Sequence, residues 1–146
     1  MRRIRVIPVL LLHEGGLVKS VRFKNYQYVG DPINAVKIFN EKEIDEIVIL
    51  DIDATANQRG PDFQKISEIA GEAFIPLAYG GGIKSIADVQ KLFYVGVEKI
   101  ILNHSAFQQP QLITASARMV GSQSVVVSID VNKNWLGKYK VFIKNG

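Results

Sequence analysis

The residues whose type and spacing most clearly suit ligand binding are three consecutive glycines, Gly80 to Gly82. They follow an apolar run and precede Ser85 at the start of a predicted helix. Glycine leaves its backbone N–H uncovered and turns readily at positive φ. A loop of this kind, placed between a strand and a helix N-terminus, suits an anion such as phosphate. Glycine turns without a ligand are also common. The glycines alone therefore leave a phosphate site and a plain turn as open alternatives.

Polar side chains also end the other predicted strands. Asp51 and Asp53 close one apolar stretch, Asn103 closes another and Asp130 closes a third. In parallel α/β folds the carboxyl edge of the sheet holds the active site. A single polar strand end would be a helix cap, but these three together with the glycine loop make four successive strand ends that favour a site.

The elements that must position these residues alternate along the chain. Amphipathic helices are predicted to begin at Asp31-Pro32, Pro61, Ser85 and Pro110, between apolar stretches that predict strands. The alternation predicts an α/β fold with a parallel sheet in the order 1-2-3-4-5, not the reordered 2-1-3-4-5. Residues 17–23 are predicted as a loop with strand character, and residues 133–146 as a small hairpin. The predicted strands span residues 4–12, buried on both faces, then 47–52, 75–78, 99–102 and 124–129.

Charged residues mark the opposite edge of this sheet. Arg5, Glu46 and Lys99 lie where predicted strands begin. Charges at the mouths of buried strands must pair or reach water. They form either a solvated surface salt bridge or a charged plug at the floor of a barrel.

Composition limits the class of protein. The chain has 146 residues, 47% hydrophobic and 22% charged, which predicts one globular domain. It contains no cysteine, so disulfides and thiolate metal sites are excluded, and we expect no metal and no cofactor. No apolar run is long enough to span a membrane and no signal-peptide pattern opens the chain, so we expect no membrane partner and a cytoplasmic protein.

The net charge of +4 comes largely from the two ends of the chain. A nucleic-acid surface would need a basic stripe interleaved with aromatic residues, whereas acids and bases alternate between the ends. We therefore expect no nucleic-acid partner, and the positive excess fits a phosphorylated small-molecule substrate. The basic residues concerned are Arg2, Arg3, Arg5, Lys133, Lys138, Lys140 and Lys144.

Several segments together resemble one family, the cyclase subunit of imidazole glycerol phosphate synthase, known as HisF. The resemblance runs over the whole chain, and its segments taken together are highly specific. They are Gly30-Asp31-Pro32, Ile44-Asp45-Glu46, Leu50-Asp51-Ile52, Gly80-Gly81-Gly82-Ile83, Gly121-Ser122-Gln123 and Val125-Val126-Val127-Ser128-Ile129-Asp130.

The resemblance implies a TIM (βα)8 barrel and a lyase-type cyclisation in histidine biosynthesis. Ammonia would come from a glutaminase (HisH-like) partner at the barrel floor and reach a bis-phosphorylated ribulosyl substrate at the top. Arg5, Glu46 and Lys99 would be three of the four charges that gate the ammonia passage. The resemblance assigns the substrate and its phosphate to Lys19 of the mobile first loop, Asp51, Gly81, Gly82, Asn103, His104 and Ser105.

Two departures from the family pattern bear on activity. The family uses two carboxylates; Asp130 is the second, but the first should fall at Leu11, which cannot move a proton. His13 and Glu14 are near but shifted by two or three residues, which points them elsewhere. The leucine run resembles a HisF paralogue found with surface-polysaccharide genes, where it is associated with sugar amidation beside a glutaminase-like partner.

Length is the second departure. Residues 1–146 are expected to form the N-terminal half of the barrel, with about strands 1–5 and helices 1–4. The other half carries the family's second phosphate site, and without it strand edges and an apolar surface are exposed. We therefore expect pairing with a second half-barrel or with another copy, and no cyclase activity in this chain alone. The alternative function is a non-catalytic half-barrel, a scaffold or truncated relic that binds phosphate or a partner.

Overall fold

A computed structural model describes residues 4–21 and 24–142 of the chain. Arg2, Arg3 and Lys144 of the basic ends, and residues 143–146 of the predicted hairpin, lie outside the described residues. None of the helices in the described part is long and apolar enough to cross a membrane.

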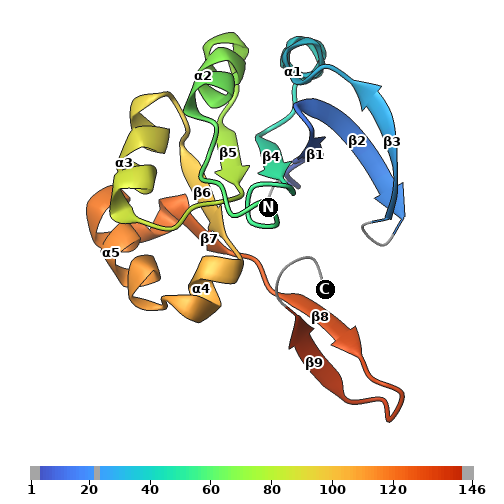
Figure 1. The fold of residues 1–146 in the computed structure, drawn as a ribbon. Coiled ribbons are helices and arrows are strands. Elements are labelled where there is room, and N and C mark those ends of the chain that lie inside the picture. The colour runs from blue at the N-terminus through green and yellow to red at the C-terminus, as the bar shows by residue number, and fades with distance from the viewer. Residues whose placement is uncertain (1–3, 22–23, 143–146) are drawn as a thin grey trace.

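A seven-stranded sheet with helices along one face forms the body of the molecule (Figure 1). The sheet order is β3-β2-β1-β4-β5-β6-β7, and a separate two-stranded hairpin pairs β8 with β9. The strands are β1 (Val9–His13), β2 (Gly16–Val21), β3 (Lys24–Gly30), β4 (Ile47–Asp51), β5 (Leu77–Gly80), β6 (Lys99–Leu102), β7 (Val125–Val127), β8 (Asp130–Lys133) and β9 (Tyr139–Phe142). The helices are α1 (Pro32–Asn40), α2 (Phe63–Glu72), α3 (Ile86–Tyr94), α4 (His104–Gln108), α5 (Gln111–Val120) and the 3₁₀ turn η1 (Ser122–Ser124).

The predicted strand order is confirmed. The strands β1, β4, β5, β6 and β7 pair as parallel neighbours in that sequence. They correspond to the five predicted strands, so the arrangement is the one expected for half of a TIM barrel. All their carboxyl ends therefore meet at one edge of the sheet.

The core lies between the sheet and the helices. Alternate side chains of β4, Ile47 and Ile49, point at the helices, as does Leu12 of β1, and all three are buried. Burial of each large apolar side chain contributes roughly 1.5–3 kcal/mol. The helix residues that meet them in the core include Val36, Ile66, Ile69, Val89, Leu92 and Leu112.

Local sequence sets where the helices begin. The side chain of Asp31 accepts hydrogen bonds from two N–H groups of α1, and Pro32 is its first residue, as predicted. Ser85 forms a capping box with Asp88 at the start of α3. The predicted start of the second helix at Pro61 is slightly early, because Asp62 caps a helix that begins at Phe63.

The prediction that residues 4–12 form a strand buried on both faces is wrong. The strand begins only at Val9, whose side chain is 55% exposed, and Ile4 is 87% exposed. The helices lie along one face of the sheet (Figure 1), so inward-facing residues of β1 have no covering layer in this part of the chain. We call the face opposite the helices the inner face.

Three connections differ in detail from the prediction. Strand character at residues 17–21 is confirmed, but it belongs to a β2–β3 hairpin that extends the sheet beyond β1, while residues 22–23 lie outside the described part. The short helix α4 was not predicted, so the described chain has more helices than the four expected. The predicted strand 124–129 shortens to β7, and Asp130 instead opens β8 of the expected C-terminal hairpin.

Candidate functional site

A cleft of about 120 Å³ opens at the carboxyl edge of the parallel strands. It brings together most of the side chains that the sequence assigned to a site, and Leu11 of β1 lies among them. The predicted residues on its wall are Asp51, Gly81, Gly82, Asn103, His104, Ser105 and Asp130.

The glycines of this cleft are required by packing. Gly81 and Gly82 have φ values of +128° and +68°. A Cβ on Gly81 would lie 2.4 Å from the carbonyl oxygen of Asp51, and one on Gly82 would lie 2.7 Å from that of Arg59. The loop after β5 therefore fits against the loop after β4 only with glycine at both positions. This contact gives the plain-turn alternative a physical basis, and it does not exclude an anion.

Asn103 and Asp130 meet at the rim of the cleft. The Asn103 Nδ2 donates to Asp130 Oδ2 at 3.0 Å and to the carbonyl of Ser128 at 3.1 Å. The end of β6 is thereby tied to the start of β8. The hydroxyl of Ser105 donates to the carbonyl of Ile83, which joins α4 to the glycine loop.

His104 begins α4 beside these groups. Its Nδ1 is buried and makes no hydrogen bond with any described residue. The imidazole therefore retains unused hydrogen-bonding capacity next to the cleft. Among the described residues no group of three His, Asp or Glu side chains is placed to hold a metal ion.

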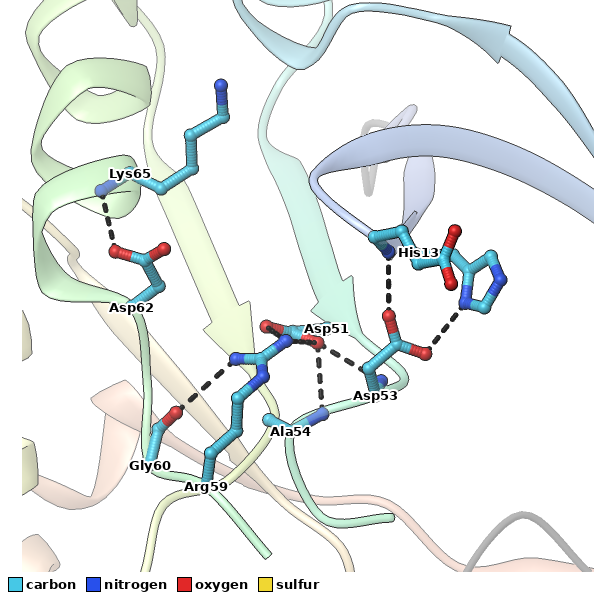
Figure 2. A network of polar contacts seen from close by, with 9 residues as sticks. His13, Asp51, Asp53, Ala54, Arg59, Gly60, Asp62 and Lys65 are labelled. Atoms are coloured by element: carbon cyan, nitrogen blue, oxygen red, sulfur yellow. Dashed lines mark hydrogen bonds and ion pairs between the residues drawn. The ribbon is translucent and has the colours of Figure 1, made fainter. Parts of the chain in front are cut away.

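Asp51 ends β4, and its carboxylate accepts hydrogen bonds from its own loop (Figure 2). Arg59 Nη2 lies 2.9 Å from Oδ1 and 2.8 Å from Oδ2 of Asp51. The backbone N–H groups of Asp53 and Ala54 each donate to Oδ1 at 3.1 Å. Asp51 thus lines the cleft, but its carboxylate holds the loop that contacts the glycines.

The charge of Asp51 affects two neighbours. Burial disfavours the Arg59 charge, but the hydrogen bond and charge of Asp51 outweigh it and raise the pKa of Arg59. Burial, together with the negative charge of Asp51, raises the pKa of Tyr79 far above its ordinary value. The Tyr79 side chain is only 1% exposed, and its hydroxyl makes no hydrogen bond of normal length with described residues.

A second carboxylate at this edge, Asp53, faces a different way (Figure 2). Its Oδ1 lies 2.7 Å from His13 Nδ1, and its Oδ2 accepts from the backbone N–H of Glu14 at 2.7 Å. The ring of Tyr26 lies 4.3 Å from that of His13, measured between centroids. The pair borders a second cleft, of about 520 Å³, on the β2–β3 hairpin; its wall contains His13, Glu14, Gly15, Gly16, Val18, Tyr26, Tyr28 and Asp31.

Lys19 is the one predicted substrate-binding residue that the structure does not place in either cleft. It is exposed on β2, opposite Gln27 of β3. It therefore lies on the hairpin and away from the phosphate-site residues in this conformation.

The predicted charged group at the amino edge does assemble. Arg5 Nη2 lies 2.8 Å from Glu46 Oε2, and Lys99 Nζ donates to the same oxygen. Glu46 is 3% exposed, so its carboxylate is buried and shared by two cations. A buried charge must be paired to be tolerated, and this group meets that condition. The simple alternative of a solvated surface pair does not describe Glu46.

Sequence reasoning missed Arg59 and did not pair His13 with Asp53. Arg59 lies in a loop with no periodicity, and nothing in one sequence connects it to Asp51 eight residues before. His13 and Asp53 are 40 residues apart and meet only because β1 and β4 are neighbours in the sheet. The strand-end position of Asp53 was the only available signal.

The fold and the polar carboxyl edge define a parallel βα protein of the TIM-barrel type, with a candidate anion cleft above a buried charged floor. Residues 5–146 match the family model described as histidine biosynthesis protein, and the chain belongs to that family, within its HisF-like imidazole glycerol phosphate synthase group.

Relatives with this name align with all or nearly all of the chain. The chain is 53% identical over 146 residues to "Putative imidazole glycerol phosphate synthase subunit hisF2" of Pseudomonas aeruginosa. The aligned region covers 100% of this chain and 58% of that protein. The chain is 42% identical over 142 residues to imidazole glycerol phosphate synthase subunit HisF of Helicobacter hepaticus, covering 97% of this chain and 57% of that protein. The chain therefore spans little more than half the length of these relatives.

Proposed function

We propose that this chain forms the N-terminal half of a HisF-like barrel that delivers ammonia to a phosphorylated substrate. The observation that carries the proposal is the pairing of two features on one sheet. A buried carboxylate, Glu46, holds Arg5 and Lys99 at the amino edge, and the cleft with Asn103 and Asp130 lies at the carboxyl edge. A charged entrance below and a substrate cleft above are the two parts that such a reaction needs.

In this proposal the cleft binds one phosphate of the substrate. Gly82, Asn103, His104 and Ser105 supply the contacts, and the unpartnered Nδ1 of His104 supports a role as a donor. Gly81 allows the loop to turn, and Asp51 positions the adjoining loop through Arg59. Lys19 would reach the substrate only if the β2–β3 hairpin folds over the cleft.

Asp130 is the proposed proton-transfer group of the cleft. Its Oδ2 accepts from Asn103, which orients the carboxylate at the strand ends. The second carboxylate of the family pattern is replaced by Leu11, which lines the same cleft and cannot transfer a proton. This replacement supports divergence from cyclisation toward sugar amidation in surface-polysaccharide synthesis.

The proposed source of ammonia is a glutaminase subunit that docks at the amino edge. Glu46 is buried beneath Arg5, whose side chain remains 51% exposed and accessible to a partner. Opening the Arg5–Glu46 pair would give a small neutral molecule a route between the charged side chains.

A second half-barrel is the other proposed partner. Inner-face and edge residues such as Val9, Val126 and Ile129 are 55%, 41% and 55% exposed. Covering several such side chains would contribute roughly 1.5–3 kcal/mol each. We expect the chain to associate with a second half or with another copy, and light scattering measures this directly. A well-folded monomer that does not associate would contradict this part.

The catalytic part is tested with ammonium chloride as nitrogen source. The unmodified chain, Leu11→Asp and the matched control Leu11→Asn are each assayed for cyclisation of the bis-phosphorylated ribulosyl substrate, with and without a supplied second half-barrel. We expect cyclisation only for Leu11→Asp with the second half, because a positioned acid or base contributes on the order of 10²–10⁴ in rate. Substantial cyclisation by the unmodified chain alone would overturn the argument.

The phosphate site has a separate test. Titration with inorganic phosphate should shift the backbone amide resonances of Gly82, Asn103, His104 and Ser105, with sodium chloride at equal ionic strength as the control. The alternative function is a non-catalytic scaffold. It would be favoured if the chain binds phosphate and a partner but supports no ammonia-dependent turnover when a second half-barrel is supplied. Leu11 in the cleft is the observation on which that alternative rests.

A further inference from the structure

The contact between His13 and Asp53 is the feature that the proposed function does not use. The two side chains are 25% and 14% exposed, so the pair is partly buried and still reachable from solvent. Asp53 Oδ1 lies 2.7 Å from Nδ1 of the imidazole. Because an ionised carboxylate only accepts hydrogen bonds, this contact assigns the proton to Nδ1 and leaves Nε2 of the neutral ring with a free lone pair.

The position of His13 relates it to the cleft at the carboxyl edge. Side chains alternate along a strand, so His13 lies on the same inner face of β1 as Leu11, which lines that cleft, while His13 itself lines the neighbouring second cleft. Two residues along a strand span about 7 Å, and the shift is toward the carboxyl end, where substrate binds in parallel sheets. His13 therefore lies one step beyond the place where the family pattern has its first carboxylate.

We propose that His13 is a catalytic general acid–base of this protein, held in its working tautomer by Asp53, in place of the carboxylate that Leu11 cannot supply. This inference rests on the proposed function, because it concerns the same ammonia-dependent reaction. Asp53 acts through His13 and is a positioning residue. In this geometry Nε2 of the imidazole acts as the base, and the carboxylate orients the ring through Nδ1.

The proton transfer can be written completely for attack of ammonia on a carbon doubly bonded to oxygen. The nitrogen lone pair forms the C–N bond, and the π electrons move to the oxygen. The new –NH3⁺ group loses one proton to Nε2 of His13, and the resulting imidazolium is stabilised by the Asp53 carboxylate. His13 then gives this proton to the oxygen, so the product carries –NH2 and –OH and the enzyme is unchanged.

Other polar and charged side chains line the same cleft as His13. The β1–β2 turn contributes the carboxylate of Glu14, the start of α1 contributes Asp31, and β3 contributes the phenols of Tyr26 and Tyr28. Asp31 already accepts two backbone hydrogen bonds as a helix cap, and the Tyr26 ring stacks at a tilt of 32°. Asp53 is the carboxylate among these groups that directly contacts the ring.

A purely structural role for the pair makes different predictions. Asp53 also accepts from the backbone N–H of Glu14, so it fixes the tight turn between β1 and β2. If the pair only anchors this turn, His13→Gln should change stability and leave the proton-transfer step unaffected. A pH profile and a chemical probe of Nε2 separate the two roles.

The chemical probe is diethyl pyrocarbonate, which transfers an ethoxycarbonyl group to an unprotonated imidazole nitrogen and releases ethanol and carbon dioxide. The chain has two histidines, His13 and His104, and peptide mass spectrometry distinguishes them. We expect modification of His13 with a limiting alkaline rate that falls several-fold in Asp53→Asn and is unchanged in Asp62→Asn, which lies outside both clefts. An unreactive His13, or an equal rate in Asp53→Asn, would overturn the proposal.

The turnover test uses the chain supplied with a second half-barrel, with ammonium chloride as nitrogen source and a phosphorylated carbonyl substrate. We expect His13→Gln to lose about 100-fold or more and to lack the acid limb of the wild-type pH profile, Asp53→Asn to lose less, and Asp62→Asn, outside both clefts, to match wild type. Wild-type turnover with an unaffected His13→Gln would refute the role of His13 and leave the proposed function intact. A reactive, Asp53-dependent His13 in a protein without ammonia-dependent turnover would support the dyad and refute the proposed function.

Discussion

Asp51 is the last residue of β4 and Asp53 lies two residues further on, yet the two carboxylates have opposite roles (Figure 2). The side chain of Asp51 is 2% exposed, and its contacts come from within eight residues of its own loop. Asp53 is 14% exposed and reaches across to the turn after β1. Asp51 stabilises its own loop, whereas Asp53 connects the end of β4 to the end of β1.

The partners of the two carboxylates explain the difference in role. Asp51 pairs with an arginine, which stays charged at all relevant pH values and has no proton to give. Asp53 pairs with a histidine, whose second ring nitrogen remains available for proton transfer. A carboxylate at the carboxyl edge of a parallel sheet is therefore not by itself a catalytic group, and its partner decides whether it stabilises or reacts.

The largest expected effect on stability comes from removing the charge of Asp51. Asp51→Asn should lower the free energy of unfolding by about 3 kcal/mol, the low end for breaking a buried ion pair because Arg59 is 39% exposed. The measurement is urea denaturation at fixed protein concentration. The control is Asp62→Asn, which keeps a good helix cap and should change stability little. Equal losses in the two variants would contradict the role of Asp51.

The next effect concerns the glycine that receives the Asp51 loop. Gly81→Ala places a Cβ 2.4 Å from the Asp51 carbonyl oxygen at a φ of +128°, and should cost about 2 kcal/mol of stability. Gly71→Ala is the matched control, because its Cβ would meet nothing within 4 Å in α2. Alanine should stabilise that helix by about 0.5–1 kcal/mol. Thermal denaturation that ranks the two variants the other way would refute the packing argument.

A smaller loss of stability is expected from Asp53. Asp53→Asn retains an acceptor for the N–H of Glu14 and loses the charge that faces His13, so the expected cost is about 1 kcal/mol. This loss should be clearly smaller than that of Asp51→Asn in the same denaturation series. A larger loss would mean that Asp53 is the main structural carboxylate of this edge.

The smallest effect belongs to Tyr79, which burial keeps protonated in the folded state. Its pKa is raised on folding, so its contribution to stability is fully present below about pH 10, the ordinary tyrosine value, and is lost as pH rises above it. Tyr79→Phe should change stability by less than about 0.5 kcal/mol at pH 7, because the hydroxyl it removes makes no hydrogen bond of normal length with a described residue.

The same variant should flatten the fall in stability above pH 10, since phenylalanine cannot ionise. Denaturation midpoints at neutral and alkaline pH measure this difference. Tyr94→Phe is the control, because Tyr94 is 90% exposed and should leave the alkaline fall unchanged. Identical alkaline behaviour in both variants would show that burial of Tyr79 does not govern it.

How much the sequence predicts depends on how local the cause is. The capping box of Ser85 and Asp88 and the polar ends of the strands are written within a few residues, and they located both the helix starts and the cleft. The His13–Asp53 contact depends on β1 lying beside β4 and on the register in which the two strands pair. The exposure of Val9 depends on what covers the inner face of the sheet. An apolar sequence pattern does not predict whether such a covering layer is present.

The most direct test of the central claim is the protonation state of the His13 ring, read by ¹⁵N NMR on histidine-labelled protein. We predict that at neutral pH the neutral ring of His13 carries its proton on Nδ1, that Asp53→Asn weakens this preference, and that Asp51→Asn leaves it unchanged in the molecules that fold. A proton on Nε2 in the wild-type protein, or the same mixture of tautomers in wild type and Asp53→Asn, would contradict it.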